Sequence, residues 1–397
     1  MPHETSIRNQ LRDMEGDRLR VLVVGAGVAG LAVAGLLRRS GLHPVLIDRA
    51  GPDAPSGYML ALMPLVDPVL AELGVSQEYW DRSVPLDRYR IRNRHGALVR
   101  EYSLGKLLNT YGDYRGISRG ELMNVLAAPA RTVAHHTSVT AMDQRANSVT
   151  VIFSEAGTEV RGEFDAVIVA DGLHSSTREL VLDAELVPTF DTGWGGWVVW
   201  AEADGDSDLG EELWGTGYFV GTYPVKDRLG VIVCGPRTEK GAGLGAFVAR
   251  LRDRTPEAGP RLDRVLTEAV DGRESYYWSL TDCRAAEWTV GRVALVGDAA
   301  AGFLPTAGIG AGMAMESAGA LVRHLADCEP HLVPTALAAF ERGQRPRVEA
   351  AQKNSRQLAP MMFNRNPVAA MLRDTAARFV PLGVALRPIQ GLLETRP

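Results

Sequence analysis

The feature that most constrains the fold of this chain is an uncharged run from Val21 to Leu37, flanked by Arg20 and Arg38. Such a run suits the core of a signal peptide or a short membrane span. However, β-branched residues crowd only its first part, and its middle holds Gly25, Gly27 and Gly30. Because glycines allow a tight turn, we interpret the run as a buried strand that turns into a buried helix.

The flanking residues extend this unit into a β-α-β pattern. Arg20–Val24 is predicted to be the first strand, Val28–Ser40 the helix and Pro44–Asp48 the second strand, with Gly41 ending the helix. Strands that alternate with helices form parallel sheets covered on both faces. The chain therefore opens on a doubly wound α/β domain.

The character of the sequence then changes twice, which predicts a second domain inserted into the first. Residues 88–103 read as a hairpin, and residues 188–280 hold most of the tryptophans, short strands and one helix near Leu244–Val270. The buried-strand pattern returns at Val293–Gly297, ahead of a helix at Gly310–Ala326. We predict a first domain of residues 19–87, 115–187 and 281–330, a mostly antiparallel second domain of residues 88–114 and 188–280, a helical segment of residues 331–397, and a loose tail of residues 1–18.

Composition and charge exclude several classes of function. The 397 residues carry a net charge of −5, and 46% are hydrophobic. No basic face suited to a nucleic acid is present. Cys234, Cys283 and Cys328 lack the spacing of a disulfide frame or a zinc site. We predict a cytoplasmic protein with no metal, no nucleic-acid partner and no stable membrane insertion, and we interpret the apolar segment Phe379–Leu393 as a docked C-terminal segment.

The first motif is Gly25-Ala26-Gly27-Val28-Ala29-Gly30, placed between a strand and a helix. Gly25 permits the turn, Gly27 lets the backbone approach a pyrophosphate, and Gly30 lets helix and strand pack closely. The amides of the helix start, including that of Ala29, would face the phosphates. Asp48 lies 18 residues beyond Gly30, where a carboxylate accepts ribose hydroxyls. This motif predicts a dinucleotide and leaves FAD and NAD as alternatives.

Two further motifs follow buried strands. Gly297-Asp298 precedes Pro305 and the run from Gly308 to Gly312, whose amides, including that of Ala311, form a nest for negative charge at a helix start. The reduced flavin ring carries such a charge, and NAD has no counterpart. Asp171-Gly172, with Ser175 and Arg178, forms the other motif. Each reads in isolation as an ordinary turn or helix cap. Arg119 opens a helix, where it would neutralise a phosphate or form a surface ion pair.

Together these motifs resemble the single-component FAD-dependent aromatic hydroxylases, the group A flavoprotein monooxygenases with the p-hydroxybenzoate hydroxylase fold. The resemblance runs from about Leu19 to Phe363 and includes GxGxxG, an Arg-x-x-Leu-x-x-x-Leu pattern beginning at Arg119, DGxxSxxR beginning at Asp171, and GD with its following proline and glycines. It implies an α/β fold with a Rossmann-like FAD-binding domain, an inserted, mostly antiparallel substrate domain, and C-terminal helices.

The resemblance also implies the residues that hold FAD. Val139 would offer its backbone to the adenine, and Asp171 belongs to a motif tied to both FAD and NAD(P)H. The full set is Gly25, Gly27, Ala29, Gly30, Asp48, Arg49, Arg119, Val139, Asp171, Asp298, Pro305, Gly308, Gly310, Ala311 and Gly312. The chain departs from many relatives at Ala301, where they have His, at Gly312, where they have Asn, and at Asp48, where their acid is longer.

The implied chemistry is monooxygenation. NADPH or NADH would reduce FAD, and O2 would then form a C4a-hydroperoxyflavin that hydroxylates or epoxidises an electron-rich carbon. No catalytic side chain is assigned. The partners would be O2 and a small aromatic, polyketide-like or alkaloid-like molecule. The alternatives are a reductase or desaturase of the same fold, a flavin-dependent halogenase and a non-catalytic flavin-binding protein. Monomer and homodimer both remain open.

The aromatic residues of the second domain are the candidates for the substrate pocket. A flat aromatic substrate favours aromatic walls, although each of these residues is also a good core residue of a small sheet. Alternation along a strand places Trp194 and Trp200 on the face opposite to Trp197. The candidates are Trp194, Trp197, Trp200, Trp214, Tyr218 and Tyr223.

Overall fold

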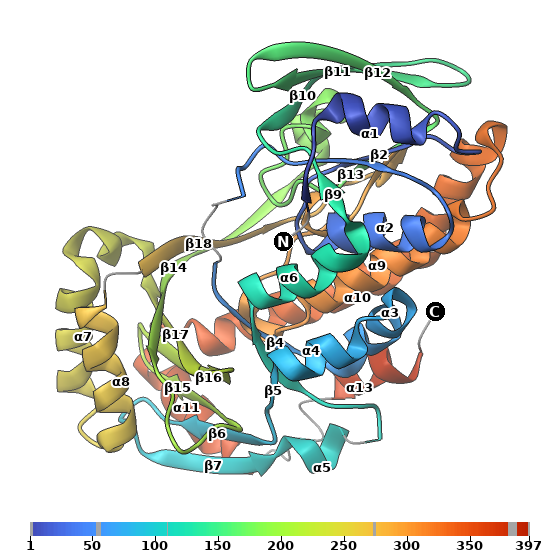
Figure 1. The fold of residues 1–397 in the computed structure, drawn as a ribbon. Helices are drawn as coiled ribbons and strands as arrows, with labels where there is room; N and C mark the ends of the chain where they lie inside the picture. The colour runs from blue at the N-terminus through green and yellow to red at the C-terminus, as the bar shows by residue number, and fades with distance from the viewer. Residues whose placement is uncertain (1–2, 53–56, 109, 273–274, 380–386, 396–397) are drawn as a thin grey trace.

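A computed structural model describes residues 3–52, 57–108, 110–272, 275–379 and 387–395 of the chain (Figure 1). The centre of the first domain is a five-stranded sheet of order β19-β20-β13-β2-β3. Neighbouring strands are parallel except for the pair β19 and β20. The strands are β19 (Thr289–Val290), β20 (Val293–Leu295), β13 (Ala166–Val169), β2 (Val21–Val24) and β3 (Val45–Ile47).

Helices and a small sheet cover this central sheet. Helix α2 contacts both α6 and α9, and α10 contacts α9. An antiparallel sheet of β10 (Thr137–Gln144), β11 (Val149–Glu155) and β12 (Thr158–Phe164) lies at the top of Figure 1. The helices are α2 (Val28–Arg39), α3 (Asp67–Leu73), α4 (Ser76–Arg82), α6 (Arg119–Ala130), α9 (Gly310–Leu325) and α10 (Val333–Met362).

Residues 3–14 form a strand and a helix that pack on the first domain, so the prediction of a loose tail was wrong. Helix α1 (Ile7–Met14) begins at Ser6, whose side chain accepts a hydrogen bond from a first-turn amide. Ile7 is fully buried, and the side chain of Gln10 bonds the backbone of Leu46 in β3 through both its oxygen and its nitrogen. Strand β1 (His3–Glu4) pairs with β9 (Thr132–Val133). These contacts attach the segment to the edge of the central sheet.

The second domain is a seven-stranded sheet of order β18-β14-β17-β16-β15-β6-β7, in which β15 and β6 are parallel and the other pairs are antiparallel. A three-stranded sheet of order β4-β8-β5 lies between it and the first domain. The strands are β18 (Ser275–Cys283), β14 (Thr189–Glu202), β17 (Arg228–Pro236), β16 (Phe219–Val225), β15 (Leu209–Trp214), β6 (Arg88–Arg92), β7 (Leu98–Ser103), β4 (Met59–Leu62), β8 (Arg115–Ser118) and β5 (Val84–Pro85).

One face of the large sheet is covered by helices. The single helix expected near residues 244–270 is two helices, α7 (Gly243–Arg254) and α8 (Gly259–Asp271). Pro256 falls between them, and Gly259 has a φ of +80°, a left-handed conformation that favours glycine and breaks a helix. Val199, Val231 and Val265 are buried in the core between this face and the helices. The opposite face of the sheet is turned toward the first domain.

The C-terminal part is helical. After α10 come α11 (Pro367–Ala377) and α13 (Arg387–Glu394). Elsewhere in the chain, the short helix α5 (Leu104–Leu108) follows β7. The segment Phe379–Leu393 falls partly outside the described residues, and its described part, α13, contacts α10. None of the described helices is both long and apolar enough to cross a membrane. The predicted fold class, a mixed α/β protein with C-terminal helices, is confirmed.

Candidate functional site

The three sequence motifs meet at the carboxyl ends of the central strands. A Cβ on Gly25, which follows β2, would lie 2.7 Å from the Cα of Asp171, which follows β13. A Cβ on Gly297, next to Asp298, would lie 2.9 Å from the Cβ of Ala29 in the first turn of α2. Segments distant in sequence therefore share the sheet edge at which doubly wound folds bind ligands.

The glycines of the first motif have distinct roles. Gly25 has a φ of +99°, which L side chains rarely adopt. A Cβ on Gly30 would lie 1.8 Å from the carbonyl oxygen of Gly25, so helix and strand pack closely only with glycine here. A Cβ on Gly27 would meet nothing within 4 Å. Gly27 also caps α2 without a side-chain hydrogen bond, which leaves the first amides of the helix for an anion.

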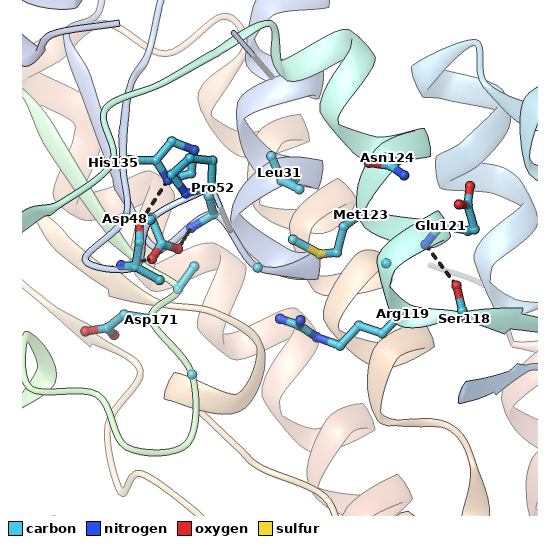
Figure 2. Close-up of a pocket in the computed structure, with 18 of the residues that line it drawn as sticks. Leu31, Asp48, Pro52, Ser118, Arg119, Glu121, Met123, Asn124, His135 and Asp171 are labelled. Carbon is cyan, nitrogen blue, oxygen red and sulfur yellow. Dashed lines mark hydrogen bonds between the residues drawn. The ribbon is translucent and has the colours of Figure 1, made fainter. Parts of the chain in front are cut away.

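A cavity of about 1030 Å³ opens beside these glycines (Figure 2). Second-domain side chains also border it, among them Trp200, Lys226 and Arg228. The cavity is therefore shared by the two domains. The predicted cofactor-binding residues that line it are Gly25, Gly27, Asp48, Arg49, Arg119, Val139 and Asp171.

Two carboxylates in the cavity differ in their hydrogen bonding. The two oxygens of Asp48 accept the amides of Ala26 and Ala50, each at 2.7 Å, so this side chain also fixes the glycine turn. Asp171 Oδ2 accepts the Thr177 amide at 3.2 Å, but its buried Oδ1 has no hydrogen-bond partner among the described residues. Because buried acceptors are almost always paired, Asp171 Oδ1 indicates a position for a ligand donor.

Arg119 supplies positive charge to the cavity. Figure 2 shows its side chain reaching inward from the start of α6, on the side opposite Asp48 and Asp171. No ion pair or side-chain hydrogen bond of Arg119 is formed with the part of the chain that the structure describes. A cation placed in a cavity without a protein partner is suited to a phosphate.

Asp298 lies within electrostatic reach of Arg119. Desolvation by the surrounding protein raises the pKa of Asp298 to about 6, and Arg119 partly opposes that rise. Asp298 nevertheless keeps an exposed surface. Asp298 is not one of the residues that line the cavity described above. A ligand donor that reached its exposed surface would oppose the desolvation of the carboxylate.

A second helix start lies farther along the site. A short 3-10 turn, Pro305–Ala307, ends at Gly308, which has a φ of +62°. Helix α9 then begins with Ile309 as its N-cap, again without a side-chain hydrogen bond. The first amides of α9, those of Gly310, Ala311 and Gly312, are therefore free of a capping side chain.

The glycines at this helix start face different surroundings. A Cβ on Gly308 would lie 3.9 Å from the hydroxyl of Tyr114, on the side of the second domain. A Cβ on Gly310 would lie 3.1 Å from Phe303, and one on Gly312 would lie 3.2 Å from Leu65. The Cα atoms of Gly310 and Gly312 thus pack against protein. A ligand could contact these residues only through their backbone amides.

The aromatic candidates divide between the two faces of the large sheet. Trp200 lines the cavity, and Trp194 packs 5.2 Å from Phe363 between ring centroids on the same face. Trp197 and Tyr218 lie on the other face, buried in the core against α7 and α8. The large sheet therefore separates these two candidates from the cavity that Trp200 lines. Trp214 and Tyr223 lie on the face turned toward the first domain, in the apolar clusters that hold Trp194 and Trp200.

Sequence reasoning missed several residues of the site. His135 and Ser138 lie at the cavity on either side of β10's start, and Lys226 and Arg228 reach it from the turn between β16 and β17. Exposed basic residues in a turn give no signal in the sequence, because their approach depends on how the domains pack. The buried carboxylate Glu212 was also missed, because β15 was not among the predicted strands and two adjacent glutamates are typical of an exposed segment.

Comparison with known proteins identifies the family. A family model described as an FAD binding domain matches residues 18–355. The chain belongs to this family. The predicted membership of the FAD-dependent aromatic hydroxylases is confirmed, and so is the class of enzyme, an FAD-dependent monooxygenase.

Three relatives illustrate the similarity. A flavin-dependent monooxygenase of Legionella longbeachae is 26% identical over 77% of this chain and 79% of its own. The 3-amino-4-hydroxybenzoate 2-monooxygenase PtmB3 of Streptomyces platensis is 26% identical over 87% of this chain and 88% of its own. The 6-hydroxynicotinate 3-monooxygenase of Pseudomonas fluorescens is 26% identical over 88% of this chain and 93% of its own.

Solved structures share the fold. HpxO of Klebsiella pneumoniae, complexed with FAD and uric acid, superposes with a TM-score of 0.82 at 23% identity, over 95% of this chain and 96% of its own. CtdE, complexed with FAD and a substrate, superposes with a TM-score of 0.79 at 17% identity, over 95% of this chain and 99% of its own.

The residues present fit FAD. The uncapped start of α2, the unpaired Arg119 and the unpaired Oδ1 of Asp171 offer what a pyrophosphate and sugar hydroxyls require. The uncapped start of α9 offers a second anion site, which a flavin ring uses and a nicotinamide dinucleotide does not.

Proposed function

We propose that this enzyme uses NADPH or NADH and O2 to hydroxylate or epoxidise a small, electron-rich aromatic molecule. The observation that carries the proposal is a pair of uncapped helix starts. The start of α2 borders the cavity, where Trp200 of the large sheet also lies, and a Cβ on Gly297 would lie 2.9 Å from Ala29 of α2 and 3.5 Å from Ala314 of α9. The names of two relatives, which act on 3-amino-4-hydroxybenzoate and on 6-hydroxynicotinate, support an aromatic substrate. When bound, FAD supplies electron transfer from the reductant and the activation of O2.

The proposal assigns the predicted residues to parts of FAD. Gly27, the amides of α2 and Arg119 hold the pyrophosphate, Asp48 and Val139 the adenosine, and Asp298 the ribityl chain. The amides of Gly310, Ala311 and Gly312 stabilise negative charge on the flavin ring. Gly25 and Gly30 shape the turn, Arg49 borders the adenosine part, Asp171 adds an acceptor, and Pro305 and Gly308 border the ring.

The second domain supplies the other half of the reaction chamber. Its inner face contacts the short sheet β4-β8-β5 through β16, and Tyr114 lies near Gly308. In the proposal these elements exclude water from the oxygen transfer. We assign this sheet, residues 88–114 and 188–280, to substrate binding. Cytoplasmic action is part of the proposal because Cys234, Cys283 and Cys328 are all unpaired.

Isotope labelling tests the proposed reaction. Purified protein loaded with FAD is screened for aromatic compounds that accelerate NAD(P)H oxidation, and a responding compound is converted under ¹⁸O2. One ¹⁸O atom is expected per product molecule, with one NAD(P)H consumed per turnover when coupling is complete. Product without ¹⁸O, or turnover that continues in the absence of oxygen, would contradict monooxygenation.

A further inference from the structure

Strand β15 carries two adjacent buried glutamates that point to opposite faces of the large sheet. Glu211 and Leu213 face helices α7 and α8, and Leu213 belongs to the core formed there. Glu212 and Trp214 alternate with them and face the first domain. Both carboxylates are buried, at 1% and 6% exposure. They therefore allow a direct comparison of how each charge is compensated.

Glu211 is compensated by cations of the protein. It forms ion pairs with Arg92 at 2.7 Å, with Arg261 at 2.6 Å and with Arg90 at 3.4 Å. These partners hold the pKa of Glu211 below its ordinary value, although burial acts in the opposite direction. Such a carboxylate has a structural role, because removing it would leave the Arg92 guanidinium without an ion-pair partner among the described residues.

Glu212 has no such partner: within the part of the chain that the structure describes, it forms no ion pair with a basic side chain. Instead it accepts three hydrogen bonds from neutral groups. The Tyr89 hydroxyl donates to Oε2 at 2.5 Å, the Trp214 indole nitrogen donates to Oε2 at 2.7 Å, and the Tyr223 hydroxyl donates to Oε1. A buried carboxylate without a cation is costly.

The Glu212 cluster, defined as Glu212 with Tyr89, Trp214 and Tyr223, lies beside the proposed flavin ring site. Tyr114 connects the two, because its hydroxyl is 3.9 Å from where a Cβ on Gly308 would lie. Burial and, next, the charge of Glu212 raise the pKa of Tyr114. Strand β16 also contacts β4 and β8 of the first domain. The cluster is thus on the substrate side of the site.

The aromatic members of the Glu212 cluster, Tyr89, Trp214 and Tyr223, are partly exposed, and so is the neighbouring Tyr114. Burial nevertheless raises the pKa of the Tyr89 and Tyr223 hydroxyls well above the ordinary value. Each ring therefore keeps some surface that a ligand can contact, although the hydroxyls are poorly hydrated. The cluster is therefore accessible to a small molecule that enters the site.

The hydrogen bonds within the Glu212 cluster determine which chemical groups it can still bind. Trp214 donates only, and its one N–H is used on Glu212. The hydroxyl hydrogens of Tyr89 and Tyr223 are used on the same carboxylate. What the cluster still offers a ligand is acceptors: a lone pair on Oε1 of Glu212 and the two phenolic oxygens. Burial raises the pKa of Glu212, so a cationic group that donates to these acceptors would stabilise the charged carboxylate, whereas an anion would be repelled by it.

We propose that the Glu212 cluster is a substrate subsite that binds an amine, above all a protonated one, of an electron-rich aromatic substrate and excludes aromatic acids. The proposal rests on the proposed monooxygenase function, because it places the substrate beside the FAD site. It deepens that function by naming the charge class of the substrate.

Three phenols that differ in charge at one end test this proposal: tyramine, 4-ethylphenol and 4-hydroxyphenylacetate. Binding to the FAD-loaded protein is measured by titration calorimetry and by the change in flavin absorbance. Wild-type protein is expected to bind tyramine most tightly and 4-hydroxyphenylacetate most weakly. In Glu212→Gln, tyramine affinity should fall by about tenfold, the loss of one charge-assisted hydrogen bond. The affinity for 4-ethylphenol should change by less than about threefold.

Two controls keep the test decisive. Tyr223→Phe removes one phenolic oxygen but keeps the carboxylate, so the preference for tyramine should weaken less than it does in Glu212→Gln. FAD content and melting temperature report whether each variant is folded, and the order of the three phenols on wild-type protein tests the charge preference without any variant. Equal binding of the three, preference for the acid, or no binding of any at millimolar concentration would overturn the proposal.

The result is separable from the test of oxygenation. Calorimetric binding requires neither O2 nor NAD(P)H. A tyramine preference without ¹⁸O incorporation would therefore contradict the proposed monooxygenase function while still supporting the amine subsite. Conversely, ¹⁸O incorporation into an aromatic acid, with no role for Glu212, would leave the function and overturn the subsite.

Discussion

At the scale of single residues, the FAD site contains groups whose state in the free protein is unfavourable. Asp298 is desolvated without a hydrogen-bonded cation, Arg119 has no ion-pair partner in the described structure, and Asp171 Oδ1 is buried without a donor. Each would gain a partner from a sugar hydroxyl or a phosphate. Groups that cost stability in the free protein are a common property of binding sites.

The pH dependence of stability tests this view of Asp298. Its pKa is about 6 in the folded protein, whereas about 3.9 is usual in an unfolded chain. Between these values the folded state binds more protons, so stability falls as pH rises through this window and the unfavourable contribution is complete above it. Without FAD, Asp298→Asn should therefore raise the melting temperature at pH 7.5.

At pH 4.5 the gain should be smaller, because Asp298 is then protonated in the folded wild-type protein as well. Thermal melts of FAD-free wild-type and variant protein at both pH values provide the measurement. The same variant should bind FAD more weakly, since Asn accepts a ribityl hydroxyl without the help of charge. A wild-type protein that is the more stable of the two at pH 7.5 would refute the desolvation argument.

At the scale of elements, the start of α2 combines a packing requirement with a ligand requirement in adjacent glycines. Gly30 is required by the approach of α2 to the Gly25 turn, whereas Gly27 borders open space. The two roles separate in a matched pair of alanine variants. Gly30→Ala should destabilise the FAD-free protein by about 1–3 kcal/mol or more, as overpacking does.

Gly27→Ala should destabilise the free protein by about 0.5–1 kcal/mol, less than Gly30→Ala, because alanine is a poorer N-cap than glycine but meets no atom here. Its methyl group would instead occupy the approach of the pyrophosphate, so FAD affinity should fall. Urea unfolding of the free protein and fluorescence titration with FAD measure the two effects. A Gly27→Ala variant that unfolds early but binds FAD normally would reverse the assignment.

Helix α1 shows what local pattern can and cannot reveal. Ile7, Leu11 and Met14 follow a helical repeat after the capping residue Ser6, which is a signal for an amphipathic helix. The polar residues around these three positions made the helical repeat difficult to recognise. That Gln10 would bond the backbone of β3 could not be predicted, because a polar residue gains a buried role only through a tertiary contact.

At the scale of the whole molecule, the FAD motifs could be predicted because each is a local pattern of strand, glycine turn and helix. Their meeting at one sheet edge followed from the parallel order of the strands. The substrate face could not be predicted in the same way. Alternation separates Trp197 from Trp200, but it does not say which face the helices α7 and α8 cover. Lys226 and Arg228 reach the cavity only because the domains pack together.

FAD bound in the cavity as proposed would contact both domains. The cavity is lined by first-domain residues and by the β16–β17 turn, where the Lys226 amine also donates to the Asp81 carbonyl at 2.7 Å. Ligand that binds only the folded state stabilises it, by about 2.7 kcal/mol at a hundredfold excess over Kd. Removing FAD should therefore lower the melting temperature and loosen this turn.

Limited trypsin digestion measures the second effect. Lys226 and Arg228 are exposed trypsin sites in the turn at the cavity, and their cleavage should be faster in FAD-free protein and slow again when FAD is restored. Arg145, exposed in the β10–β11 turn and absent from the cavity lining, is the matched control. Its cleavage should change little, because turn opening there is local. Equal protection of Arg145 and the β16–β17 turn would mean that FAD acts only on global unfolding. Protection of neither, with an unchanged melting temperature, would place FAD outside this cavity.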